Sequence, residues 1–322
     1  MATMRAVRIH SFGGPEVLTV EEIATPRPMA GEVLVRVRAA SVNPVDYKIR
    51  SGRYPAVGRD RLPVVLGRDI AGEVVESGGG ADDLPTAGDP VYAMLGPDRG
   101  GYADCVVVKA EELAPMPDGL TAAEAAAVPL AGLTAWQGLF DQGGLREGQR
   151  VLIHGGAGGV GHFAIQFAKA RGAFVATTVA GDDLEFAHRL GADQAVDYKA
   201  DRFEERVEPV DVVFDLVGGE TRERSWAVLK PGGVLVSTLG APSEDEARAH
   251  RARGAGYMAQ PNGRQLDEIR ELIEAREVRP VIGAVMALKD AALAHERLER
   301  HGLRGKLVLE VAGEDDQPAA GV

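Results

Sequence analysis

Between about residues 150 and 277, short apolar runs alternate with segments whose apolar residues recur at helical spacing. The run 151–153 has the length of a buried strand, and Val160, Phe163 and Phe167 recur on one face of the helix that would follow. We expect further strands at 173–178, 194–198, 210–219, 233–240 and 256–260, and helices at 183–191, from 201, and at 221–230, 244–254 and 264–277. Six strands with helices between them predict an α/β domain with a doubly wound, parallel, six-stranded sheet.

The first 120 residues show a different pattern. In 31–41, Val33, Val35 and Val37 alternate with polar residues, which is typical of a half-buried strand. Further short strands are expected at 69–80, 89–95 and 102–110, each separated by turns rich in Gly, Pro and Asp. This region is therefore predicted to be mostly antiparallel β structure.

Two further segments complete the expected division into domains. Thr121 and Glu124 have capping-box spacing and should open a helical segment over 121–140, which Pro129 should kink. After Pro280 we expect one more helix, with Ala291, Ala294 and Leu298 in register, and a last strand at 306–311. We expect these last elements to rejoin the first domain. The predicted domains are 1–124 with 280–322, and 125–279, with a cleft between them.

Composition and charge narrow the class of protein. The chain has 322 residues, 45% hydrophobic and 26% charged, which is typical of a globular protein. A net charge of −12 gives no basic surface for nucleic acid or anionic membrane. No apolar run reaches the roughly 18–20 residues of a membrane span, and the first residues lack the apolar middle of a signal peptide. The single cysteine, Cys105, excludes an intrachain disulfide. We expect a cytoplasmic enzyme.

The densest chemical signal is the glycine-rich turn after the strand 151–153. Gly156, Gly158 and Gly161 have the spacing G-x-G-x-x-G, with Ala157, Gly159 and Val160 between them. In a strand–turn–helix context, we expect Gly156 to permit the tight turn, Gly158 to let a pyrophosphate approach, and Gly161 to let the helix pack closely on the strand. The N-terminal end of the helix would then favour the phosphates. The alternative is a glycine turn with packing duties only.

Five stretches in order along the chain resemble one known family. They are SVNPVDYKIRSG (41–52), LPVVLGRDIAGEVVESG (62–78), GDPVYAM (88–94), VLIHGGAGGVG and RGKLVLEV. Together they resemble the zinc-free quinone oxidoreductases of the medium-chain dehydrogenase/reductase superfamily, close to the enone and alkenal reductase branch. The resemblance implies a GroES-like, β-rich substrate domain, a Rossmann domain, a nicotinamide cofactor and a homodimer.

The positions that bind zinc in sister families carry other residues here. Those families have a cysteine near position 42 and Gly-His-Glu where this chain has Gly67, Arg68 and Asp69, and position 42 is Val. The seven histidines are scattered along the sequence. Because a zinc site needs three or four suitably placed ligands, we predict that the protein has no metal site.

Without a metal, a polar side chain must steady the oxyanion that forms when hydride reaches the substrate. Lys48 is our first candidate, because an ammonium group can steady an oxyanion or a cofactor phosphate. Tyr47 and Asn43 are further catalytic candidates in the same motif. The alternatives are a solvated lysine and an Asn-Pro turn without a catalytic role.

The second strand of the parallel sheet bears on the choice between NAD and NADP. It ends in Thr177 and Thr178 instead of the carboxylate that usually holds the ribose hydroxyl of NAD, which favours NADP(H). Tyr198 matches a tyrosine that lines the adenosine phosphate site in relatives, whereas Asp183 stands where NADP-dependent relatives often have lysine. Arg189 could compensate for that lysine or could be a surface residue. Gly240 and Lys306 are further cofactor-binding candidates.

These features predict an NADPH-dependent reductase that transfers hydride to quinones or α,β-unsaturated carbonyls without zinc. One alternative is a stand-alone enoyl reductase that acts on thioester-bound intermediates. Another is an NADPH-binding sensor without catalytic turnover, since a fold does not dictate an activity. The expected partner is a small-molecule quinone or enone, with neither nucleic acid nor membrane.

Overall fold

A computed structural model describes residues 2–80, 84–300 and 302–311. The chain divides into two compact units, which are described separately. The first unit comprises Met1–Leu130, Gln260–Glu274 and Pro280–Val322, and the second comprises Ala131–Ala259 and Ala275–Arg279. The first unit thus includes 125–130 and Gln260–Glu274, which we had expected in the second domain. The functional domain division remains a prediction.

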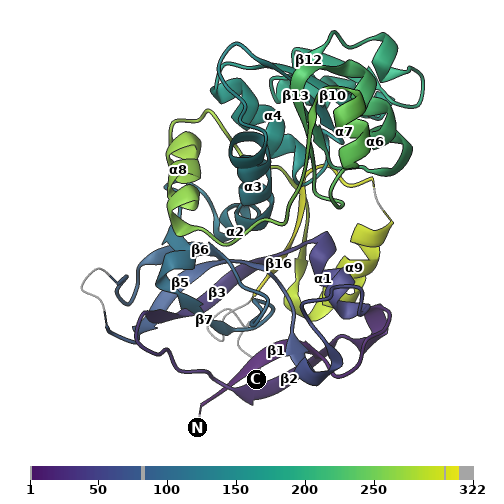
Figure 1. Ribbon diagram of the computed structural model, residues 1–322. Helices are drawn as coiled ribbons and strands as arrows, with labels where there is room; N and C mark the ends of the chain where they lie inside the picture. Colours follow the sequence, from purple (N-terminus) through teal and green to yellow (C-terminus); the bar gives the residue numbers. More distant parts are fainter. Residues whose placement is uncertain (1, 81–83, 301, 312–322) are drawn as a thin grey trace. The chain divides into compact units, whose positions relative to one another are not determined.

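The first unit is built mainly from antiparallel strands (Figure 1). Its larger sheet, within the described residues, has seven strands in the order β15-β16-β3-β5-β6-β8, with β7 also paired to β3. The strands are β3 (Glu32–Val42), β5 (Asp69–Ser77), β6 (Pro90–Met94), β7 (Cys105–Lys109), β8 (Leu113–Pro115), β15 (Ile282–Ala287) and β16 (Lys306–Glu310). A smaller sheet has the order β2-β1-β4, with β1 (Thr3–Ile9), β2 (Thr19–Ala24) and β4 (Val64–Val65). The expected β-rich architecture of the first domain is confirmed.

The alternation in β3 has the expected physical cause. Val33, Val35 and Val37 are almost completely buried in the core of this unit, whereas Arg36 on the other face is exposed. The end of β3 departs from the alternation, because residues from Ala39 to Val42 are all buried. There β3 pairs with β5 and β16 along its two edges, and α2 (Ala122–Ala126) and α9 (Ala291–Glu299) contact the strand.

The sequence pattern predicted some of the helices of the first unit but not all of them. They are α1 (Pro44–Arg50), α2 (Ala122–Ala126), α8 (Gly263–Glu274) and α9 (Ala291–Glu299). The capping box is confirmed, since the Glu124 N–H donates to Thr121 Oγ1 at 3.2 Å and the Thr121 N–H donates to Glu124 Oε2 at 2.8 Å. Pro129 does not kink one long helix, as we had expected. It begins a separate helix, α3 (Pro129–Trp136), followed by a π-helical turn over Gln137–Gln142, because proline lacks the N–H that a continuous helix needs.

The second unit contains a six-stranded sheet whose pairings are all parallel, in the order β11-β10-β9-β12-β13-β14. The strands are β9 (Arg150–His154), β10 (Phe174–Val179), β11 (Gln194–Asp197), β12 (Val210–Asp215), β13 (Leu229–Ser237) and β14 (Arg253–Gly256). The helices are α4 (Gly161–Ala170), α5 (Leu184–Arg189), α6 (Gly219–Ser225) and α7 (Glu244–Ala249). Figure 1 shows α4 on one side of these strands and α6 and α7 on the other. This is the doubly wound Rossmann arrangement that the sequence predicted. Strands are added on one side of β9 as far as β11, and the chain then crosses to the other side of β9 for β12, β13 and β14.

Two elements of this unit were placed wrongly from the sequence. The sixth strand, β14, ends at Gly256 instead of beginning there, because 253–256 is the segment that pairs with β13. Gly254 and Gly256 lie against Pro242 and Ala241, where a side chain would be crowded. The segment from 201 forms only a single 3₁₀ turn at Phe203–Glu205 instead of a longer helix. Neither feature has the hydrophobic periodicity on which our expectation depended.

Candidate active site

The glycine turn of the second unit joins β9 to α4 at the carboxyl edge of the parallel sheet, beside the point where the strand order reverses. The tight turn occurs at Gly155, with φ of +79°, and not at Gly156 as we had expected. Gly156 is constrained for a different reason. A Cβ there would lie 2.9 Å from Ile165 Cδ1 and closer still to the Thr177 hydroxyl.

The other two glycines of the motif differ in what surrounds them. A Cβ at Gly161 would lie 2.7 Å from the Gly156 Cα and would also collide with the Gly155 carbonyl, which confirms the expected close packing of helix on strand. A Cβ at Gly158 would meet only the Gly155 carbonyl oxygen, at 3.4 Å, and its φ lies outside the positive range. The protein itself therefore leaves room for a side chain at Gly158. Such an open position is compatible with the approach of a phosphate, which stays a prediction.

The strand ends beside this turn hold the expected cofactor candidates. Thr178 accepts hydrogen bonds through its carbonyl oxygen from the N–H groups of Gly155 and Gly156, at 3.1 and 3.2 Å. Thr177 is buried and donates its hydroxyl to the Ile153 carbonyl oxygen at 2.7 Å. The two threonines thus fix the turn against β9 and β10.

Two further candidates lie in loops at the same edge of the sheet. Tyr198 directly follows β11, is 58% exposed, and has the Lys199 ammonium 5.8 Å from its ring centre. Gly240 follows β13 with φ of +103°, and its carbonyl oxygen accepts a bond from Arg222 Nη1 at 3.4 Å. Because ligands of such sheets bind beyond the carboxyl ends of the strands, these positions suit a dinucleotide.

Buried polar residues that the sequence analysis missed support this edge. Asp215 ends β12 and accepts bonds from the N–H groups of Val217 and Gly218, at 3.0 and 2.7 Å, and from the Ser237 hydroxyl at 2.8 Å. His154 ends β9 and lies 3.0 Å from the Thr178 hydroxyl, and burial lowers its pKa to about 4. Polar residues at the end of buried strands are the signal that could have identified both.

The first unit contains a buried group of four residues, Ser41, Asn43, Asp69 and Lys306, which we call the polar cluster. The Asp69 carboxylate accepts bonds from the Ser41 hydroxyl at 2.5 Å and from Asn43 Nδ2 at 2.8 Å. The Lys306 ammonium donates to Asn43 Oδ1 and lies 3.7 Å from Asp69 Oδ2. Burial lowers the pKa of Lys306, and the charge of Asp69 opposes that effect. The cluster joins β3, β5 and β16, and the sequence had assigned Lys306 only to the cofactor.

A second chain of hydrogen bonds begins at α1. Asp46 accepts bonds from the Asn43 N–H at 2.8 Å and from the Tyr102 hydroxyl at 3.1 Å. Tyr102 also lies 3.3 Å from His295 Nε2, and His295 Nδ1 lies 3.2 Å from Arg50. Burial raises the pKa of Asp46 to about 7 and lowers that of His295 to about 3. These groups hold α1 and α9 together at the side of the sheet.

The two remaining catalytic candidates lie on α1 and are both half-buried. The Tyr47 hydroxyl is protonated at neutral pH and able to donate, and burial raises its pKa further above the ordinary value of 10. The Lys48 side chain makes no hydrogen bond or ion pair with the described residues. Lys48 and Tyr47 therefore keep polar atoms available for a ligand, whereas Asn43 uses its side chain within the polar cluster.

No group of three or more His, Cys, Asp or Glu side chains that could hold a metal occurs in the described part of the chain. Val42 is buried in the core, and Asp69 is engaged in the polar cluster. The residues present at these positions therefore do not fit a zinc ion.

Comparison with known proteins decides the family. Residues 29–118 match the family described as alcohol dehydrogenase GroES-like domain, and residues 190–309 match that described as zinc-binding dehydrogenase. The quinone oxidoreductase of Pseudomonas aeruginosa is 35% identical over 326 residues, which cover 95% of this chain and 99% of that protein. The chloroplastic NADPH-dependent alkenal/one oxidoreductase of Arabidopsis thaliana is 36% identical over 318 residues, which cover 95% of this chain and 79% of that protein. The chain belongs to the medium-chain dehydrogenase/reductase superfamily, in its quinone and alkenal/one oxidoreductase branch.

Solved structures of the superfamily agree with this assignment. The quinone oxidoreductase of Coxiella burnetii is 37% identical, with a TM-score of 0.88 over 97% of this chain and 100% of that one. A mycobacterial protein, Rv1454c, solved in complex with NADPH, is 31% identical, with a TM-score of 0.85 over 95% of this chain and 100% of that one. This member of the superfamily is therefore an NAD(P)H-dependent oxidoreductase of the quinone and alkenal reductase type. None of its described helices has the length and apolar character needed to cross a bilayer.

Proposed function

We propose that this protein reduces quinones or α,β-unsaturated carbonyl compounds with NADPH and without zinc. The observation that carries the proposal is the open position at Gly158, at the carboxyl edge of the first strand of a Rossmann sheet. Neither a steric contact nor a positive φ requires glycine there, and the open position supports the approach of a ligand phosphate. Bound NADPH would supply the hydride.

The chain's own residues have separable roles in binding the cofactor. The turn over 156–161 and the N-terminal end of α4 bind the pyrophosphate, because the helix dipole and the N–H groups other than those of Gly156 and Gly158, which are bonded within the protein, favour negative charge. Thr178, Tyr198 and Gly240 flank the adenosine half. In this proposal Thr177 acts indirectly, since its hydroxyl is already bonded to β9.

The preference for NADPH has support from the end of β10. No carboxylate there holds a ribose 2′-hydroxyl, and Lys199 offers a positive charge beside the exposed ring of Tyr198. Asp183 opposes the preference, because a carboxylate repels a 2′-phosphate. We propose that the first effect is larger.

The substrate side of the proposal concerns α1. Lys48 and Tyr47 steady the oxyanion that develops on the acceptor, through an ammonium group and a protonated hydroxyl. Asn43 positions α1, because its N–H and side chain are both bonded, to Asp46 and to the polar cluster. In this proposal Lys306 acts through Asn43, by fixing its side chain amide.

The direct test measures NADPH and NADH oxidation against quinones, enones and thioester-bound enoyl substrates, and in parallel the oxidation of simple alcohols. We expect turnover of quinones or enones and none of alcohols, because alcohol oxidation must first remove a hydroxyl proton, which sister enzymes achieve with zinc. Selective turnover of thioesters would favour an enoyl reductase, and NADPH binding without turnover would favour a sensor. A homodimer and a cytoplasmic location are also proposed, and gel filtration with light scattering tests the former.

A further inference from the structure

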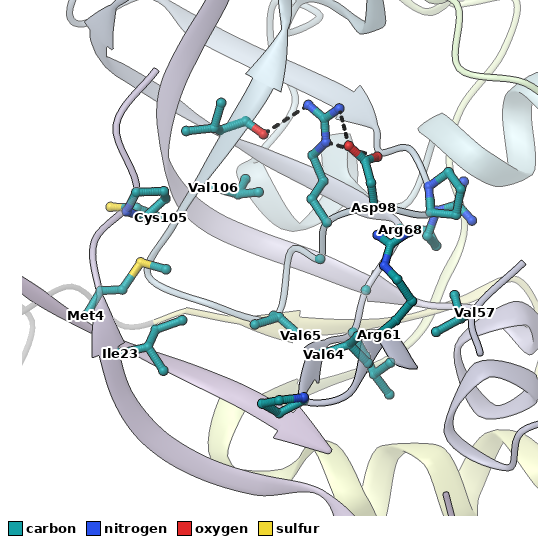
Figure 2. A pocket seen from close by; sticks show the side chains of 18 of the residues that line it. Met4, Ile23, Val57, Arg61, Val64, Val65, Arg68, Asp98, Cys105 and Val106 are labelled. Carbon is teal, nitrogen blue, oxygen red and sulfur yellow. Dashed lines mark hydrogen bonds and ion pairs between the residues drawn. The ribbon is translucent and has the colours of Figure 1, made fainter. Parts of the chain in front are cut away.

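The first unit contains a cavity of about 500 Å³ that none of the expected site residues lines. All of its lining residues belong to that unit. They come from β1, β2, β3, β4, β7 and α1, from the loops on either side of β4, and from the loops after β2 and β6. Figure 2 shows Arg68, Arg61 and Asp98 gathered on one side of the cavity and Met4, Ile23 and Cys105 on the other. The cavity therefore has a charged end and an apolar end.

The charged end contains a buried arginine without a matching acid. Arg68 is 4% exposed, and its one hydrogen bond to the described residues runs from Nε to the Leu95 carbonyl oxygen, at 2.6 Å. No carboxylate of the described chain forms an ion pair with it. Burial raises the pKa of Asp46, the acid whose pKa Arg68 lowers, to about 7, so that Asp46 is only partly ionised at neutral pH. The Arg68 Nη groups donate no hydrogen bond to the described residues and are not sealed from solvent, so they can donate to an anion that enters the cavity.

The strand geometry explains why Arg68 faces the cavity. Asp69 begins β5 and points into the polar cluster, and successive side chains of an extended chain point to opposite faces. Arg68 therefore lies on the other face from Asp69, and the zinc-ligand position of sister families is here occupied by a cation that lines a cavity.

The remaining charges of the cavity also favour an anion. Arg27 and Arg61 are exposed at its rim, while Arg99 is already paired with Asp98 at 2.9 Å and with Glu112 at 3.5 Å. Four arginines and two acids line the cavity, in a chain whose net charge is −12. This is a local positive site in an otherwise acidic protein.

We propose that the cavity binds a small organic carboxylate with an apolar body, separately from the reductase reaction. The carboxylate lies against the Nη groups of Arg68, which match it in a bidentate fashion, with Arg61 at the rim. The apolar body lies against Met4, Ile23 and Val106. A cavity of this volume is within the usual range for small-molecule sites.

The single cysteine of the chain gives a direct test, because Cys105 lines the apolar end. The rate at which methyl methanethiosulfonate modifies Cys105 in the full-length protein is measured with octanoate, octanol or inorganic phosphate present. We expect octanoate to slow the reaction in a saturable way, and octanol and phosphate to have little effect. Equal protection by octanol, or no protection by octanoate at millimolar concentration, would overturn the proposal.

Two variants separate the charged end from the apolar end. Arg68→Gln should weaken octanoate protection about tenfold, as expected for the loss of a charged hydrogen-bond pair. Arg59→Gln, an exposed neighbour that does not line the cavity, should leave protection unchanged. If Arg68→Gln does not fold, Ile23→Trp provides the second test, because a large ring at the half-buried apolar end should exclude octanoate. Unchanged protection in the folded variant contradicts the proposal.

Discussion

Substitutions at Gly158 and Gly161 separate cofactor binding from folding within a single turn. A methyl group at Gly158 would meet only the Gly155 carbonyl oxygen, at 3.4 Å, and the backbone there is accessible to alanine. We expect Gly158→Ala to change the free energy of unfolding by no more than about 1 kcal/mol. At Gly161 the same methyl group would lie 2.7 Å from the Gly156 Cα. Gly161→Ala should therefore destabilise the fold by about 1–3 kcal/mol.

At Gly158 we expect a large effect on cofactor binding, in contrast to the small effect on stability. The methyl group of Gly158→Ala would occupy the space proposed for the pyrophosphate and weaken one or more charged hydrogen bonds, at about 1.5–3 kcal/mol each. The dissociation constant for NADPH should rise about 10- to 100-fold. Gly158→Asp adds a negative charge beside the phosphates and should abolish binding altogether.

A fluorescence titration with NADPH and a urea unfolding curve for each variant are the required measurements. The decisive result is a loss of NADPH affinity in Gly158→Ala and Gly158→Asp while the unfolding midpoint stays close to that of the wild type. Wild-type affinity in a folded Gly158→Asp protein would refute the assignment of this turn to the cofactor. A stability loss in Gly158→Ala as large as that in Gly161→Ala would refute the steric argument.

Four further predictions concern metal, specificity, catalysis and pH. Elemental analysis should find far less than one zinc per chain and chelators should leave activity intact; about one zinc per chain would contradict this. Asp183→Lys should tighten NADPH binding more than NADH binding in a titration, and equal effects would place Asp183 away from the 2′-phosphate. Lys48→Ala should lower kcat/KM for quinones or enones about tenfold or more with an unchanged melting temperature, and the exposed Lys289→Ala is the matched control. The pKa of Asp46 is raised from 3.8 to about 7, so the folded state holds this proton more tightly than the unfolded state. The free energy of unfolding should therefore fall by about 4 kcal/mol as pH rises from about 4 to 7. Asp46→Asn should remove this part of the pH dependence in urea unfolding, and identical pH profiles for the two proteins would contradict the prediction.

Much of the fold was predictable because the pattern of apolar residues records which side chains must leave water. The alternation in β3 and the helical spacing of Phe163 and Phe167 in α4 located those elements. The spacing of Gly156, Gly158 and Gly161 similarly placed a close-packed turn between a strand and a helix. Periods of two and 3.6 are local properties of the chain, so that they can be read without knowledge of the partner.

Elements whose burial depends on distant partners were missed or misplaced from the sequence. β15 alternates between half-buried and exposed positions, but its sequence IGAVMA has no polar residue that marks the exposed face. It is a strand because β16 offers a parallel edge to it. The glycines of β14 carry no periodic signal, and that strand exists because it pairs with β13. The local pattern identifies a face to be covered, but it does not identify which segment covers it.

The polar residues of the first unit were likewise predictable only in part from the sequence. The motif around Asn43 and Lys48 was visible in the sequence, and so was the replacement of the zinc ligands at Val42 and Arg68. Only the tertiary structure brings Lys306 to Asn43 and Asp69. It also directs the Arg68 side chain away from them, toward a cavity. A buried charge is tolerated only where a partner from elsewhere in the chain, or a ligand, compensates for its lost hydration, and the order of residues in the sequence does not specify that partner.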